Sequence, residues 1–301
     1  MLIYLPIAEM SVDAFVILAL GAVAGLASGL FGVGGGFVMT PALLFYGMPP
    51  TVAVGSQAPL ILASSFSSAL QHLRRGSLDL RMGAVMSVGG LFGSAAGVGL
   101  FRLLRELGQV DLVVTVGYVL LLSTIGLLTA FETVGTLVRR RRAGRPERRR
   151  RPLLHRLPLR MRFPASHLYI SPLAPAGVGF AAGVLAALFG VGGGFLLVPA
   201  MVYVLRMPTG VVLGTSHFQI AVVAVFTTLL HAWANRSVDI VLALLGILGS
   251  VVGAQYGTRL ALRLRGEWVR GLFAVLVLLV AARLLADLVV PPADPFVVIE
   301  E

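Results

Sequence analysis

The octapeptide Leu30-Phe31-Gly32-Val33-Gly34-Gly35-Gly36-Phe37 decides the fold, because it recurs unchanged as Leu188 to Phe195. The match extends along the chain in the same order on both sides, so it is a duplication and not shared low complexity. Further matched residues are Pro41 with Pro199, Pro49 with Pro208, Gly55 with Gly214, His72 with His231, Ser77 with Ser237 and Asp79 with Asp239. The sequence therefore predicts two homologous halves.

The composition places both halves in a membrane. Of the 301 residues 57% are hydrophobic and only 12% are charged, with a mean hydropathy of +0.94. A soluble domain needs about 25% charged residues to cover its surface. Five apolar segments precede an Arg-rich stretch and five follow it, and most are long enough to cross a hydrocarbon core of about 30 Å. They run at 12–31, 36–48, 51–73, 82–103 and 111–131, then at 173–189, 194–206, 209–233, 240–261 and 269–290.

These segments predict an all-α polytopic membrane protein with about 8–10 transmembrane segments, some of them broken by glycine or re-entrant. We expect a first transmembrane repeat at 1–135, an Arg-rich cytoplasmic linker at 136–170 and a second repeat at 171–301. The segments at 36–48 and 194–206 are short, because 13 residues of helix reach only about 20 Å. Whether they span or re-enter stays open. No basic residue precedes Phe15, so we expect no cleaved signal peptide.

The charge distribution predicts the orientation. Half of the Arg residues fall between Arg139 and Arg162, and such basic segments are retained in the cytoplasm during insertion. The two ends of the chain are acidic, so both termini are expected outside an inner (plasma) membrane, with the linker inside. Each half then crosses an odd number of times, which makes the second half inverted relative to the first. A basic run can also bind nucleic acid, but in a membrane chain we interpret it as a cytoplasmic loop.

The two glycine clusters are the strongest candidates for a binding site. Glycine disfavours helix, and unwound backbone in a bilayer needs protein or a wet cavity to satisfy its polar groups. The breaks at Gly32–Gly36 and Gly190–Gly194 leave two short helices whose amino ends favour anions. Paired breaks in an inverted repeat are typical of a transporter site near the midplane. Alternatively, the glycines only permit a tight turn. Neither cluster has the Lys and Ser or Thr of a phosphate-binding loop.

Polar side chains follow each break, and we expect some of them to complete an anion site. Each could also bond its own helix carbonyls. His217 is the most deeply placed titratable residue, and an intramembrane His favours a functional role. His72 and His231 are interpreted as caps or linker contacts at the ends of their segments. The predicted substrate-binding residues are Gly34, Gly35, Gly36, Ser56, Gln57, Gly192, Gly193, Gly194, Thr215, Ser216, His217 and Gln219.

Two absences narrow the function. The chain has no Cys, which excludes disulfides and thiol catalysis. All 13 acidic residues are expected in loops or at segment ends, so no carboxylate is available mid-membrane for a cation relay. An anion carrier suits such an interior. We predict no enzyme activity, no catalytic or metal site, no cofactor and no nucleic-acid partner. Proton coupling, with His217 as the carrier, and assembly into a homo-oligomer stay open.

The run Gly-Leu-Phe-Gly-Val-Gly-Gly-Gly-Phe, which ends at Phe37 and is followed by a proline four residues later, is repeated from its leucine onward in the second half. This doubled motif resembles that of the sulfite exporter TauE/SafE family, also called the toluene sulfonate uptake permease family. The resemblance covers roughly 12–290. It implies an inner-membrane carrier for small sulfur-containing anions such as sulfite, sulfoacetate or other organosulfonates, and it implies an inverted repeat. By position, the two glycine breaks match the family motif, and Ser56-Gln57 and Thr215-Ser216 match the polar start of the following helix. The long Arg-rich linker is not a hallmark of the family.

The resulting prediction is a secondary transporter whose halves rock around a site between the breaks. A passive anion channel, a carrier for a non-sulfur anion such as a carboxylate, and an assembly subunit without transport are the alternatives. The sequence does not identify the exact substrate, the direction of transport or the coupling ion.

Overall fold

The computed structural model describes residues 2–141, 161–235, 237–264 and 266–289. Two short hairpins and two sets of helices make up this part of the chain. The first half contains β1 (Leu2–Leu5), β2 (Met10–Asp13), α1 (Ala14–Phe31), α2 (Gly36–Phe45), α3 (Pro50–Arg74), α4 (Leu80–Glu106) and α5 (Val110–Arg141). The second contains β3 (Met161–Phe163), β4 (Leu168–Ile170), α6 (Leu173–Phe189), α7 (Gly194–Pro199), the π-helix η2 (Ala200–Val204), α8 (Thr209–Leu230), the π-helix η3 (His231–Asn235), α9 (Ile240–Ala261) and α10 (Gly266–Val289).

The helices coincide with the ten expected segments, and their ends follow local sequence signals. Asp13, Asp79 and Asp239 stand immediately before α1, α4 and α9, and each carboxylate accepts a backbone N–H from the first turn of its helix. Pro50 opens α3, where its missing N–H costs nothing. After Pro199 the short helix α7 continues as the π-helix η2.

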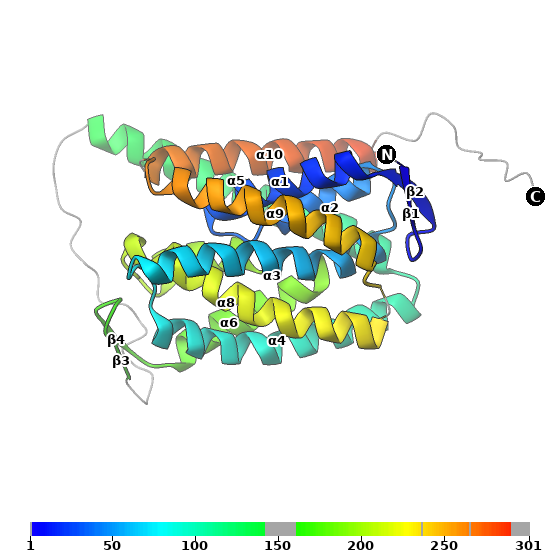
Figure 1. Cartoon of the computed structure of the whole chain (residues 1–301). Coiled ribbons are helices and arrows are strands. Elements are labelled where there is room, and N and C mark those ends of the chain that lie inside the picture. Colours follow the sequence, from blue (N-terminus) through cyan, green and yellow to red (C-terminus); the bar gives the residue numbers. More distant parts are fainter. Residues whose placement is uncertain (1, 142–160, 236, 265, 290–301) are drawn as a thin grey trace, which may run out of the picture.

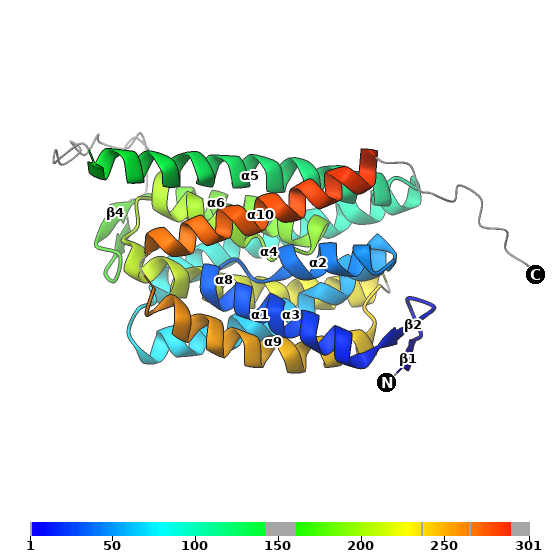
Figure 2. The same cartoon turned by 90° about the horizontal axis from the view of Figure 1, so that it is seen from above.

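Six of the described helical stretches are long and apolar enough to cross a membrane, which confirms an all-α polytopic membrane protein. They are Ala14–Phe31, Leu80–Glu106, Val110–Phe131, Thr209–Asn235, Ile240–Ala261 and Gly271–Val289. The helix α2 has 10 residues and a length of about 15 Å, half of what a crossing requires. In Figures 1 and 2 α2 runs back beside α1 towards the end from which α1 started, so the two helices form an antiparallel hairpin.

The two hairpins were not foreseen from the sequence, and they belong to the repeat. Both have a four-residue turn that begins with proline, at Pro6 and Pro164. Both turns end on a residue in the left-handed region, Glu9 with φ 52° and His167 with φ 50°. The segment 136–170 expected as a linker thus contains the end of α5 and the β3–β4 hairpin. Most of its Arg residues fall in 142–160, outside the described residues.

Helices of one half pack mainly on helices of the other. The main pairs are α1 with α9, α4 with α6, α3 with α8 and α5 with α10. The hairpin β1–β2 and the last turns of α10 lie at one end of the bundle, while β3–β4 and the last turns of α5 lie at the opposite end (Figure 1). An inverted repeat requires this arrangement. The orientation of the halves in a membrane stays a prediction.

Glycine ladders make the closest helix pairs possible, as expected for helix packing in lipid. A Cβ atom added to Gly25 of α1 would lie 2.1 Å from the carbonyl oxygen of Ser250 on α9. One added to Gly93 of α4 would lie 2.0 Å from the carbonyl oxygen of Phe180 on α6. The backbones therefore touch directly in both pairs.

Candidate functional site

Each glycine break is a chain reversal that L-amino acids adopt poorly. In the first break Gly32, Gly34 and Gly35 have φ values of 74°, 92° and 71°. In the second, Gly190, Gly192 and Gly193 have φ values of 64°, 78° and 71°. Positive φ is the region that favours glycine. The glycines therefore end α1 and α6 and turn the chain directly into α2 and α7, as the sequence predicted for broken helices.

The two breaks contact each other where the halves meet. A Cβ on Gly36 would lie 2.1 Å from the carbonyl oxygen of Gly190, and one on Gly194 would lie 2.3 Å from the Cα of Val33. The rings of Phe37 and Phe195 pack edge to face with their centroids 4.8 Å apart. The structure thus brings together the six predicted glycines, from Gly34–Gly36 and Gly192–Gly194.

Beside the second break lies a small cavity with a volume of about 10 Å³, which is about one water molecule. Ile61 of α3 and Ile220 of α8, which are matched residues of the two halves, both line it. The rest of its wall is small and mainly apolar, and consists of Ala58, Ala186, Gly190, Gly192, Val223, Ala224 and Thr227. Among the described residues the region around the breaks is therefore tightly packed.

Ser56 and Thr215, predicted at the site, instead hold loops of the opposite half. Ser56 Oγ accepts the backbone N–H of Asp239 over 2.9 Å, and Thr215 Oγ1 accepts that of Asp79 over 3.0 Å. Each aspartate also binds a hairpin turn of the other half. Asp239 Oδ2 accepts the N–H of Ile7 at 3.0 Å. Asp79 Oδ2 accepts the N–H of Ser166 at 2.9 Å and its hydroxyl at 2.6 Å.

We call these two arrangements the latches. The Asp239 latch joins Ser56, Asp239 and the β1–β2 turn, and the Asp79 latch joins Thr215, Asp79 and the β3–β4 turn. They lie at opposite ends of the bundle, beside the hairpins seen in Figure 1. Both aspartates are buried, and both latches are closed. Sequence reasoning missed these contacts, although the matched Ser-x-Asp pairs, Ser77 to Asp79 and Ser237 to Asp239, were a visible signal.

Three further predicted residues lie beside the breaks or along α8. Ser216 Oγ donates to the carbonyl of Gly32 at 3.1 Å and is also within reach of that of Leu213. Gln57 lies next to the second break, 3.4 Å from where a Cβ of Gly190 would be, and its Nε2 is buried without a partner among the described residues. Gln219 instead faces Gly90 of α4, and its Oε1 is likewise unpartnered.

His217 is fully buried and faces the first half. Its Nδ1 lies 2.7 Å from the carbonyl oxygen of Leu213, and its Nε2 lies 3.0 Å from that of Ser28. Its ring stacks on that of His72, with the centroids 5.9 Å apart. His72 Nδ1 also bonds Ser77 Oγ in the following loop, while His231 bonds Asn235 and the carbonyl of Ala187. The loop contact expected for these matched histidines is thus present at His72, whereas His231 contacts α6 and its own π-helix.

Tyr118 on α5 is a buried residue near the breaks that sequence reasoning missed. Its hydroxyl donates to the carbonyl oxygen of Phe189 over 2.6 Å, at the last residue before the second break. Its ring packs edge to face on Phe189. At the first break Phe273 of α10, which has no hydroxyl, packs on Phe31 with its ring tilted at 55°. A single Tyr in an apolar helix gives no periodic signal, which is why only the tertiary contact reveals it.

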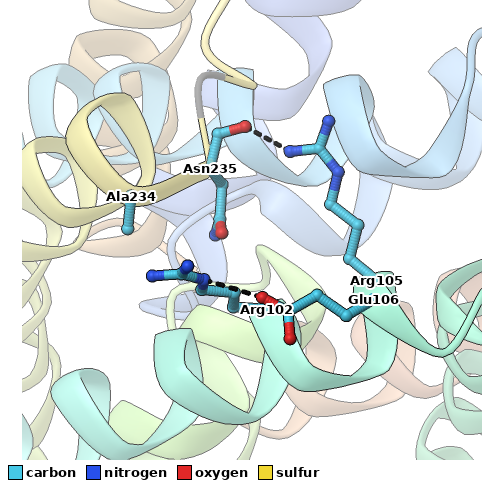
Figure 3. Close-up of a pocket in the computed structure, with 5 residues that line it drawn as sticks. All are labelled: Arg102, Arg105, Glu106, Ala234 and Asn235. Atoms are coloured by element: carbon cyan, nitrogen blue, oxygen red, sulfur yellow. Dashed lines mark hydrogen bonds and ion pairs between the residues drawn. The ribbon is translucent and has the colours of Figure 1, made fainter.

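A larger, open cavity of about 310 Å³ lies at the ends of α4 and α8, away from the breaks (Figure 3). Arg102 and Arg105 line it together with Glu106, Ala234 and Asn235. Arg102 pairs with Glu106 at 3.0 Å, and Arg105 donates to the carbonyl of Asn235. The acidic partner offsets part of the positive charge, so this surface is a weaker candidate for an anion than the buried region.

Comparisons with known proteins agree with this architecture. A probable membrane transporter protein of Xylella fastidiosa (strain 9a5c) is 30% identical over 81% of this chain and 83% of its own length. The probable membrane transporter protein YunE of Bacillus subtilis (strain 168) is 25% identical over 91% of this chain and 98% of its own. A short stretch, 25% of this chain, is 36% identical to the sulfite exporter TauE/SafE family protein 6 of Arabidopsis thaliana. No solved structure matches the chain.

The family described as sulfite exporter TauE/SafE matches residues 17–284, which includes both glycine breaks and both latches except for the hairpin residues before α1. The match covers most of the chain, and its extent agrees with that of the two repeats. The chain is a multi-pass membrane protein and belongs to the sulfite exporter TauE/SafE family of membrane transporters.

Proposed function

We propose that this protein is a secondary transporter that carries a small sulfur-containing anion, such as sulfite, sulfoacetate or another organosulfonate, across the inner membrane. The observation that carries this proposal is the contact between the two glycine breaks, which puts the amino ends of α2 and α7 at the junction of the halves. Helix amino ends attract anions, and the described residues place no carboxylate beside the breaks to repel one.

A carrier suits the described geometry better than a passive channel does. The cavity beside the breaks holds about 10 Å³, and a latch closes the bundle at each end. A carrier passes through such an occluded state when its halves rock, whereas a conducting pore needs a continuous wet path. We further propose that the halves are inverted, with both termini outside and the Arg-rich linker in the cytoplasm. Most of that linker lies outside the described residues, so the orientation rests on the charge pattern.

The test is counterflow in proteoliposomes. Vesicles loaded with unlabelled sulfite should take up labelled sulfite faster than empty ones, because a carrier exchanges substrate while a pore does not. Uptake that is unaffected by the trapped anion would favour a channel. Counterflow with acetate but none with sulfite or sulfoacetate would move the substrate class to carboxylates. For the orientation, a reporter fused after Glu301 should read as external, and a cytoplasmic signal would contradict the proposed topology.

A further inference from the structure

The two halves differ sharply in polarity at matched positions next to the breaks. Aligned through the octapeptides and through Pro49 with Pro208, four residues lining the cavity at the second break have counterparts at the first. Ala186 corresponds to Ser28, Val223 to Ser64, Ala224 to Ser65 and Ala58 to His217. Apart from Thr227, which corresponds to Ser68, the cavity at the second break is lined by residues without polar side chains, while polar residues stand at the matching sequence positions of the first half. The duplication gave two equivalent places, and one of them has become polar.

Two of these polar side chains, and the neighbouring His72 whose ring stacks on that of His217, have a polar atom without a hydrogen-bond partner among the described residues. These atoms are Ser28 Oγ, Ser65 Oγ and His72 Nε2, and the three residues are 0%, 0% and 2% exposed. Ser65 and His72 are seven residues apart on α3 and therefore share a face of that helix. Buried polar groups without partners are rare and costly in folded proteins. His217 links two of these residues, because its ring stacks on that of His72 and its Nε2 lies 3.0 Å from the carbonyl oxygen of Ser28. A ligand that supplies the missing acceptors would explain the unpartnered groups.

His217 adds a feature that favours a negative ligand. Both of its ring nitrogens face carbonyl oxygens, those of Leu213 and Ser28. A neutral imidazole has one N–H and satisfies only one of these oxygens, whereas an imidazolium donates to both. The titratable ring that faces it is His72 on α3, and the charged side chain near that ring is Arg75 after α3. The other contacts named here, from α1 and α8, are carbonyl and hydroxyl groups.

We propose that the transported oxyanion binds on one side only, in the polar cluster of Ser28, Ser65, His72 and His217, and that a proton on His217 accompanies it. This inference rests on the proposed transport of a sulfur oxyanion. A sulfite or sulfonate group presents three oxygens, which matches the two hydroxyls and His72 as donors when the His72 ring carries a proton on Nε2. The matching apolar place at the second break binds no anion and serves the packing of the halves.

The test measures sulfite binding to the purified full-length chain in detergent. The readout is the rise in the thermal unfolding midpoint as sulfite is titrated, which yields a dissociation constant. Ser28→Ala and Ser65→Ala should each raise the dissociation constant about tenfold or more, because a hydrogen bond to a charged ligand is lost. Neither variant should unfold more easily without sulfite, since each removes an unpartnered buried hydroxyl. Weaker binding in an equally stable protein is therefore the signature of a ligand contact. The matched control is Ser87→Ala, which removes an unpartnered buried hydroxyl on α4.

The outcomes separate this inference from the proposed function. If wild type binds sulfite and both serine variants bind it equally well, the polar cluster is not the site, although a sulfur oxyanion is still bound. If wild type binds no sulfur oxyanion at all, the proposed function and this inference both fail. His72→Gln gives a second measurement should a serine variant not fold, because its amide keeps a donor and should preserve more affinity than His72→Leu. Equal affinity of these two variants would exclude His72 as a ligand contact.

Discussion

Asp239 and Ser56 lie in different halves of the chain, 183 residues apart, and are joined by a 2.9 Å hydrogen bond from the backbone N–H of Asp239 to Ser56 Oγ. The pair Asp79 and Thr215 repeats this bond at the other end of the bundle. Each half therefore closes a loop of the other.

The latch hydroxyls are expected to contribute to stability. Ser56→Ala and Thr215→Val each leave a buried aspartate N–H without its acceptor, at a cost of about 1–3 kcal/mol. Thermal unfolding of the purified variants should show a lower midpoint than wild type. Ser67→Ala on the same helix as Ser56 is the control, because Ser67 is only half-buried and makes no latch contact. A Ser56→Ala midpoint equal to that of the control would mean that the bond contributes nothing.

The aspartate side chains should hold the two hairpins in place independently. Asp79→Ala removes the acceptor of the Ser166 N–H, so hydrogen exchange should accelerate at Ser166 and stay unchanged at Ile7. Asp239→Ala should give the reverse pattern. Amide exchange resolved by mass spectrometry measures both sites in one experiment. Equal acceleration of both hairpins in either variant would show that the latches act together rather than separately.

The helix pair α1 and α9 should tolerate no side chain at Gly25. In Gly25→Leu the first added atom would lie 2.1 Å from the backbone of Ser250, so the helices must separate and the folded yield should fall steeply. Gly99→Ala is the control within a helix, because nothing lies within 4 Å of its added Cβ. That variant should be more stable by up to about 1 kcal/mol. Size-exclusion profiles and unfolding midpoints distinguish the two, and a well-folded Gly25→Leu protein would contradict the packing described.

Proton coupling should depend on His217. In His217→Gln the uncharged amide cannot carry a proton and one residue of the proposed anion site is changed. Sulfite counterflow should therefore be slower than in wild type, and the remaining exchange should lose its dependence on external pH. The measurement is the initial exchange rate between about pH 5.5 and 8, a range in which histidines titrate. An unchanged pH profile in the variant would assign the coupling to another group or to none. His167→Gln, in an exposed hairpin turn, is the matched control.

Much of the fold was predictable, because each element carries a local signal. The ten segments follow from hydropathy, the breaks from clustered glycines, and the starts of α4 and α9 from Asp79 and Asp239. The hairpins escaped prediction because strands of three or four residues carry almost no periodicity. The β3–β4 pair was also assigned to the linker on account of the neighbouring Arg residues.

The candidate site was less predictable than the fold. Proximity to the breaks in sequence suggested that Ser56 and Thr215 face a ligand, yet their hydroxyls bind loops more than 130 residues away, at Asp239 and Asp79. Only the tertiary structure reveals such partners. The polarity difference between Ser28 and Ala186, by contrast, is present in the aligned halves. Its meaning depends on burial and on unpartnered atoms, which the sequence does not report.

The contact between the two breaks also limits how the halves can diverge. Gly36 contacts the backbone of Gly190, and Gly194 contacts that of Val33. Each octapeptide therefore limits the size of the side chains that the other can carry. A larger residue on one side would displace the other side and would need a compensating change there. Substitutions a few residues outside the octapeptides need no compensating change in the other half. This mutual steric constraint can therefore keep the two octapeptides identical. The flanking residues are not under it and could acquire different functions in the two halves after the duplication.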